Sequence, residues 1–125
     1  MVGELTPTEF EARRKAGNNA ILLDVREEWE LAVASIPAST AGAAGSAGSA
    51  EPAAGPAIVH VPMGEIAQRI GELDPRRETV VMCRSGRRSL EVARYLQRSG
   101  FQSVSNLTGG ILAWSRELDP SIPEY

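Results

Sequence analysis

The chain has 125 residues, 42% of them hydrophobic, and a net charge of −3, which together favour one globular domain and argue against general nucleic-acid binding. One cysteine excludes an intramolecular disulfide, and one cysteine with one histidine excludes a thiolate-rich zinc site. No apolar run reaches the roughly 18 residues of a transmembrane helix and no signal peptide opens the sequence, so we expect a soluble, cytoplasmic protein that binds neither membranes nor nucleic acids.

The first third of the chain predicts a helix, a buried strand and a second helix. The segment Thr6–Glu9 has a capping threonine, a first-turn proline and a capping-box glutamate, and the helix it starts should run to about Ala16. Ile21–Val25 is a nearly continuous apolar run, which is typical of a buried parallel strand. Glu27–Ala34 then predicts a short helix.

Residues 38–57 differ from the rest of the sequence. They are almost all Ala, Gly, Ser and Pro, with Glu51 as their one charged residue. Such a segment lacks the large apolar groups needed to offset the entropy of ordering, so we interpret it as a disordered loop. Because it follows the helix Glu27–Ala34, we expect it at the amino ends of the strands and not as a lid over the opposite edge.

The remainder of the chain alternates between predicted strands and helices. The strands are Ile58–Val61, Thr79–Met82 and Val104–Leu107, and the helices are Gly64–Ile70, Leu90–Gln97 and Ile111–Glu117. This alternation predicts an α/β fold with a central parallel sheet and helices on both faces, formed by residues 1–125 as a single domain. Trp29 and Trp114 are expected to pack in the core.

The one cysteine, Cys83, stands between a predicted strand and a predicted helix, and it opens the run Cys83–Ser89. A helix N-terminus favours negative charge, and three arginines follow the cysteine, so this position favours a thiolate. Gly86 permits a backbone conformation in which successive N–H groups turn inward around an anion. A free cysteine after an apolar strand is most often a buried small hydrophobe, but packing alone has no use for this polar, arginine-rich run.

Three motifs in order resemble those of the rhodanese family of sulfurtransferases. Cys83–Arg88 resembles the family's six-residue active-site loop, Leu23–Glu27 its N-terminal signature, and Asn106–Ile111 with Trp114 its C-terminal one. The resemblance implies a rhodanese-like domain with a sheet of about five strands, and it needs no cofactor and no metal. It makes Cys83 the nucleophile and implies loop or substrate-binding residues and two supporting residues: Arg84, Ser85, Gly86, Arg87, Arg88 and Ser89, with Asp24 and Arg26.

The resemblance further implies covalent sulfur transfer. Cys83 would take the outer sulfur of a small anionic donor such as thiosulfate and pass it to cyanide, a small thiol or a protein thiol. Arg88, the last residue of the loop, would contact the donor anion, and Asp24 would pair with an arginine to support the loop. Two alternatives stay open: a sulfur-relay module that serves a partner protein, and a phosphatase on the same fold, although Arg88 lies one position too early for a Cys-x5-Arg loop.

Overall fold

The computed structural model describes residues 2–37 and 56–125, and it places five parallel strands in one sheet. The strands are β1 (Gly3–Leu5), β2 (Ile21–Asp24), β3 (Ala57–His60), β4 (Thr79–Met82) and β5 (Val104–Leu107), in the spatial order β1-β5-β4-β2-β3. The predicted α/β fold with a parallel sheet of about five strands is therefore confirmed. The short β1 was not predicted, because three residues with one buried side chain give no periodic signal.

The predicted helices are present with shifted boundaries. They are α1 (Pro7–Lys15), α2 (Glu28–Val33), α4 (Ile66–Arg69), α5 (Arg87–Arg98) and α6 (Gly110–Glu117). The capping box predicted for Thr6 and Glu9 is formed, at 2.9 and 3.1 Å. The predicted helix over residues 64–70 is wrong as one element, because the 3-10 turns η1 (Met63–Glu65) and η2 (Ile70–Glu72) flank a single α-helical turn. A glycine in each 3-10 turn weakens helix propensity there.

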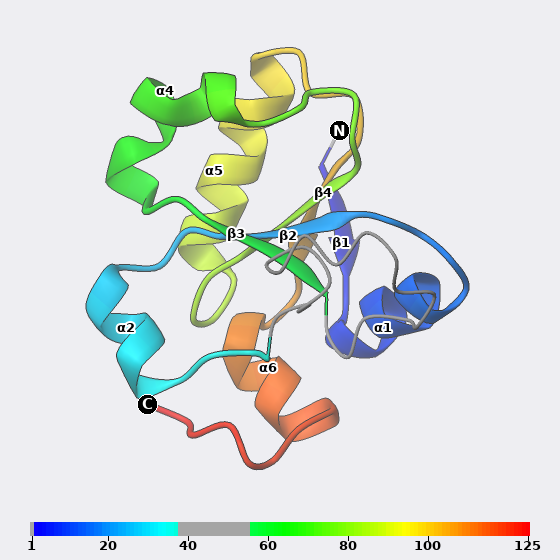
Figure 1. Ribbon diagram of the computed structural model, residues 1–125, viewed down its shortest axis with the longest axis vertical. Coiled ribbons are helices and arrows are strands. Elements are labelled where there is room, and N and C mark those ends of the chain that lie inside the picture. Colours follow the sequence, from blue (N-terminus) through cyan, green and yellow to red (C-terminus); the bar gives the residue numbers. More distant parts are fainter. Residues whose placement is uncertain (1, 38–55) are drawn as a thin grey trace, which may run out of the picture.

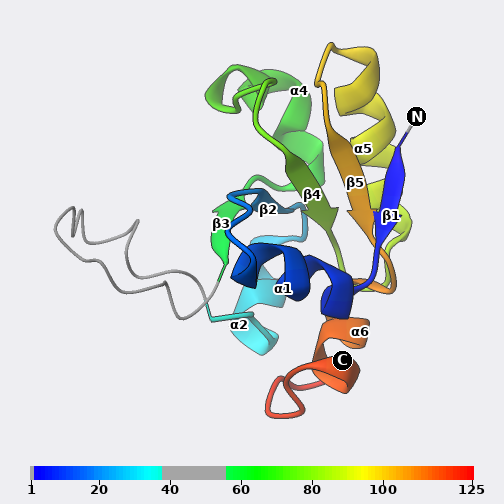
Figure 2. The same cartoon turned by 90° about the vertical axis from the view of Figure 1, so that its right-hand side faces the viewer.

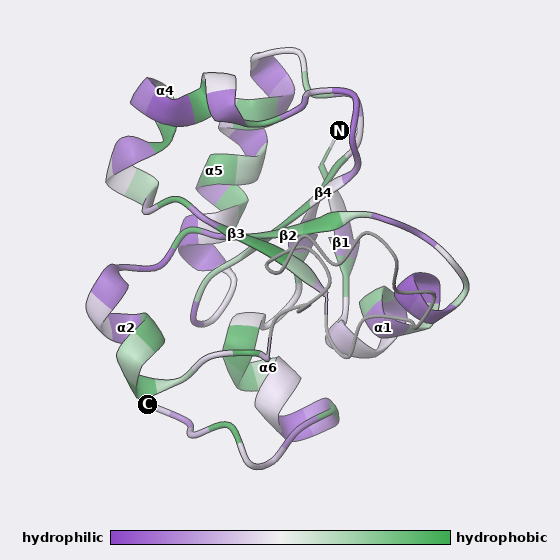
Figure 3. Cartoon of the chain, viewed as in Figure 1, coloured by the Kyte–Doolittle hydropathy of each residue, from purple (hydrophilic) through white to green (hydrophobic). Residues whose placement is uncertain are grey.

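Helices cover the sheet on both faces, as the alternating pattern predicted. Side chains of alternate strand residues point to opposite faces, so Leu23 packs in the core under α4 and α5, and Leu22 in the core under α1 and α6. Figure 3 shows apolar residues along the central strands between the two helix layers. Trp114 is buried as predicted, whereas Trp29 is 63% exposed, so its assignment to the core is wrong.

The parallel strands bring their carboxyl ends to one edge of the sheet, and Figure 2 shows β4 and β5 ending side by side there. Asp24 ends β2, and Cys83 directly follows β4. The predicted segment 38–57 lies outside the described residues up to position 55, and its last residue, Ala57, opens β3 and pairs with Ile21 at the amino ends of the strands. None of the helices in the described part of the chain is long and apolar enough to cross a membrane.

Candidate active site

The loop after β4 turns sharply into α5 at a single glycine. Gly86 has φ of 101°, a left-handed conformation that glycine adopts without a steric penalty, and it caps α5. The helix therefore begins at Arg87, three residues earlier than predicted, and Arg87, Arg88 and Ser89 form its first turn. The amide groups of this turn have no partners inside the helix and face the end of β4.

The sulfur of Cys83 lies in a cradle of hydrogen-bond donors. Cys83 is 1% exposed, and its sulfur accepts hydrogen bonds from the Gly86 N–H at 3.0 Å and from the Ser89 hydroxyl at 3.3 Å. Burial raises the pKa of the Cys83 thiol, but hydrogen bonds from the Ser89 hydroxyl and from the N–H groups of Ser89, Gly86 and Ser85 outweigh it, so the pKa lies below its ordinary value. The site therefore stabilises a thiolate, which is the nucleophilic form.

Asn106, at the end of β5, holds the serine of this cradle. Its side-chain oxygen accepts from the Ser89 hydroxyl at 2.5 Å, and its amide nitrogen donates to the Gly86 carbonyl oxygen at 3.1 Å and to the Glu4 carboxylate at 3.3 Å. Ser89 has one hydroxyl proton, so Asn106 and the sulfur of Cys83 compete for it. The asparagine thus positions both Gly86 and Ser89 beside the sulfur.

The start of α6 forms the floor of the loop. The Ile111 N–H donates to the Cys83 carbonyl oxygen at 2.9 Å, and the Leu112 N–H donates to the Arg84 carbonyl oxygen at 3.1 Å. A Cβ atom on Gly110 would lie 2.4 Å from both of these carbonyl oxygens. Only glycine at position 110 therefore lets α6 approach the loop so closely.

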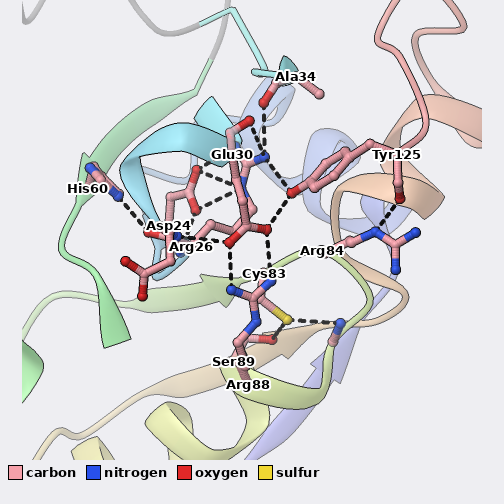
Figure 4. A network of polar contacts seen from close by, with 12 residues as sticks. Asp24, Arg26, Glu30, Ala34, His60, Cys83, Arg84, Arg88, Ser89 and Tyr125 are labelled. Atoms are coloured by element: carbon pink, nitrogen blue, oxygen red, sulfur yellow. Dashed lines mark hydrogen bonds and ion pairs between the residues drawn. The ribbon is translucent and has the colours of Figure 1, made fainter. Parts of the chain in front are cut away.

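Arg88 is held by a carboxylate that the sequence did not single out. Its guanidinium makes a bidentate pair with Glu30 at 2.7 and 2.9 Å and lies beside the sulfur of Cys83 (Figure 4). The hydrogen bonds with Arg88 lower the pKa of Glu30 to about 2 against the opposing effect of burial, and Tyr125 and the Glu27 N–H donate to the same carboxylate. Arg88 therefore faces the sulfur with its charge already paired.

Asp24 and Arg26 form a buried ion pair behind the loop. The Arg26 guanidinium contacts Asp24 at 2.8 Å and donates to the Ala34 carbonyl oxygen at 2.9 Å and to the Tyr125 hydroxyl at 3.0 Å. The predicted pairing of Asp24 with an arginine is present. In the part of the chain that the structure describes, neither residue hydrogen-bonds to the cysteine loop, and Tyr125 and Glu30 connect them to it (Figure 4).

The other predicted loop residues lie at the rim. Arg84, Ser85 and Arg87 are exposed. Arg84 donates to the Tyr125 backbone oxygen, and its guanidinium lies 5.3 Å from the centre of the Tyr125 ring. Within residues 2–37 and 56–125, the Arg87 side chain has no hydrogen-bond or ion-pair partner.

Sequence reasoning missed three side chains of this site. Glu30 had a weak signal, since it follows Glu27 at the spacing of a capping box. Asn106 stood inside a quoted motif, but without an assigned role. Tyr125 had no signal, because it comes from a distant part of the chain. The described residues contain no cluster of three or more His, Cys, Asp or Glu side chains that could hold a metal ion.

Residues 6–117 match the family model of the rhodanese-like domain. The putative sulfurtransferase YtwF of Bacillus subtilis is 33% identical, and the match covers 95% of this chain and 96% of that protein. The rhodanese-like/PpiC domain-containing protein 12 of Arabidopsis thaliana is 39% identical over 86% of this chain, but this covers 31% of the plant protein. The chain thus matches the bacterial relative over nearly the full length of both proteins, whereas it spans about a third of the plant relative.

Solved structures agree on the fold. A rhodanese-like domain protein from Staphylococcus aureus superposes with a TM-score of 0.72 and covers 99% of both chains at 21% identity. At that identity the likeness shows the fold alone. A further relative, the putative sulfur carrier protein YrkF of Bacillus subtilis, is 30% identical over 91% of this chain, which spans 51% of that protein.

Proposed function

Because the chain belongs to the rhodanese-like domain family, we propose that it is a sulfurtransferase that carries a sulfane sulfur as a persulfide on Cys83. Relatives named as sulfurtransferases support sulfur transfer in general. The observation that carries the proposal is the donor cradle, in which the Gly86 N–H and the Ser89 hydroxyl point at a buried sulfur in front of α5. This geometry favours negative charge on that one atom.

In the first step, the Cys83 thiolate attacks the outer sulfur of a donor such as thiosulfate. A new S–S bond forms between Cys83 and the outer sulfur as the S–S bond of thiosulfate breaks, and the electron pair of the broken bond leaves with sulfite. The thiolate and thiosulfate thus become a persulfide anion and sulfite. The persulfide extends the buried side chain by one S–S bond of about 2 Å. The N–H groups in the first turn of α5, which lack partners inside the helix, would stabilise the charge of the outer sulfur.

In the second step, an acceptor attacks the outer sulfur and the Cys83 thiolate leaves. Cyanide would give thiocyanate, and a thiol would give a new persulfide after losing its proton. A protein acceptor is the second candidate, because a relative is named a putative sulfur carrier protein and others join adenylyltransferase and sulfurtransferase in their names. A small acceptor and a protein acceptor would use the same chemistry at Cys83. They differ in size, and only a protein would also contact the exposed residues Arg84, Ser85 and Arg87.

Phosphatase chemistry fits this cradle less well. The residue six positions after the cysteine is Ser89, whose hydroxyl occupies the space beside the sulfur. Glu30, the carboxylate paired with Arg88, has a pKa lowered to about 2 by that arginine, so it does not hold a proton to give to a leaving group near neutral pH.

The test is the mass of the intact protein after treatment with thiosulfate. We expect an addition of about 32 Da, one sulfur atom, that cyanide removes. Cys83→Ser should abolish the addition, while Ser85→Ala, which leaves the loop N–H groups in place, should keep it. An unmodified protein that hydrolyses phosphate esters would overturn the proposal.

A further inference from the structure

Tyr125 contacts both ion pairs behind the loop and one of the loop's exposed arginines. Its hydroxyl donates to Glu30 at 2.7 Å and accepts from Arg26 at 3.0 Å, so the phenol oxygen joins two ion pairs. Its ring lies under the Arg84 guanidinium, and its backbone oxygen accepts from the same side chain. Trp29 packs edge-on against the ring, with the two ring centres 6.3 Å apart.

These contacts hold Arg84 to one side of the site. Figure 4 shows the Arg84 guanidinium directed toward Tyr125, whereas the Arg88 guanidinium lies between Glu30 and the sulfur of Cys83. Arg84 is exposed, and a solvent-exposed arginine without a fixed partner samples many rotamers. The ring and the backbone oxygen of Tyr125 restrict it to one of them.

The Tyr125 side chain is itself held in place by two buried residues, Arg26 and Glu30, through its hydroxyl group. Arg26 and Glu30 are buried, and each has further partners that fix its position, Asp24 and Arg88 respectively. The hydroxyl of Tyr125 satisfies both of them at once. The position of the exposed Arg84 is therefore set by buried groups, with Tyr125 as the connection.

We propose that Tyr125 is a positioning residue that withholds the charge of Arg84 from the sulfur of Cys83, and so sets how strongly the site prefers anionic reactants over neutral ones. The family match ends at residue 117, so this residue lies outside it. The inference deepens the proposed function, since it concerns selection of an anionic sulfur donor, and it rests on that function only for the identity of the natural reactant.

A pair of alkylating reagents tests the inference without any sulfur transfer. Iodoacetate and iodoacetamide are similar in size and differ in charge, and Cys83 is the one cysteine on which either can act. The ratio of their rate constants reports the positive charge presented at the sulfur. In Tyr125→Ala we expect this ratio to rise about three- to fivefold, as for one added charge near a screened site. Tyr125→Phe, which keeps the ring and loses the anchor, should give a smaller rise.

A double-mutant comparison assigns the effect to Arg84. Arg84→Ala should change the ratio less than about twofold in the native background, and should abolish most of the rise in the Tyr125→Ala background. Tyr95→Phe, at the other tyrosine of the chain, is the matched control and should leave the ratio unchanged. Thermal unfolding of each variant establishes that it is folded, and Tyr125→Phe keeps the test valid if Tyr125→Ala unfolds.

An unchanged or lowered ratio in the folded Tyr125 variants would overturn the inference, as would an Arg84→Ala effect that is equal in both backgrounds. A merely structural tyrosine would lower the unfolding temperature and leave the ratio alone. If thiosulfate gives no persulfide while the ratio rises as expected, the proposed function fails and the positioning role stands. If the persulfide forms and the ratio of rate constants does not change, the proposed function stands and the positioning role of Tyr125 fails.

Discussion

Replacing Ser89 by alanine should raise the pKa of Cys83 and so slow its alkylation near neutral pH. The Ser89 hydroxyl lies 3.3 Å from the sulfur, and its hydrogen bond is the largest of the effects that lower this pKa. A hydrogen bond to a charged group contributes about 1.5–3 kcal/mol, which corresponds to a change of about tenfold or more in the thiolate population. The lower end applies here, because the contact is long and Asn106 competes for the same proton at 2.5 Å.

The assay is the rate of Cys83 alkylation by iodoacetamide across pH, with thiolate ultraviolet absorbance as a second readout. The midpoint should move to higher pH in Ser89→Ala, and the rate at neutral pH should fall by up to about tenfold because less thiolate is present. Ser85→Ala is the matched control, since Ser85 acts on the sulfur through its N–H group, which alanine keeps, while its side chain is exposed. Equal midpoints in Ser89→Ala and the native protein would refute the reasoning.

Three further outcomes follow. Folding lowers the pKa of Glu30 to about 2, so its ionised carboxylate stabilises the native protein by about 3 kcal/mol, which is lost as pH falls from about 4.3 towards 2. Glu30→Gln should lack this pH-dependent stability in acid unfolding, and the same pH dependence of stability in the variant and the native protein would contradict this. Gly110→Ala should slow persulfide formation at least about tenfold, because the added Cβ would lie 2.4 Å from two loop carbonyl oxygens. Circular dichroism should show that the sheet is still formed, and an unchanged rate of persulfide formation would exclude that contact. The residues that flank positions 38–55, Pro37 and Pro56, line one cavity of about 190 Å³ whose lining does not include Cys83. Replacing residues 38–55 by a short turn should therefore leave turnover nearly unchanged, and a large loss of turnover in the folded variant would contradict this.

The sequence predicted the fold because its signals were local. Nearly continuous apolar runs such as Ile21–Val25 mark buried parallel strands, and their alternation with helices sets the layers. The capping pattern of Thr6 located α1 to within a residue. The start of α5 was placed too late, because the polar residues Arg87–Ser89 carry no hydrophobic period and Gly86 alone marks the turn.

The site was predictable where its residues are adjacent in sequence. Cys83 and Gly86 stand in one loop, and the left-handed glycine explains how the N–H groups reach the sulfur. The partners of the arginines were not predictable, because Glu30 and Tyr125 reach the loop only through tertiary packing. Arg88, which was expected to contact the donor anion, also has a partner that the sequence did not indicate, since it forms an ion pair with Glu30.

The most direct test of a Cys83 persulfide as the sulfur carrier is a single turnover by the persulfide form of the protein in the absence of donor. Protein treated with thiosulfate and freed of excess donor is mixed with cyanide, and thiocyanate and protein mass are measured over time. The account predicts about one thiocyanate for each persulfide, formed as the protein loses about 32 Da at Cys83. Thiocyanate that appears only when thiosulfate is also present, or a sulfur that cyanide leaves on the protein, would contradict a persulfide at Cys83 as the sulfur carrier.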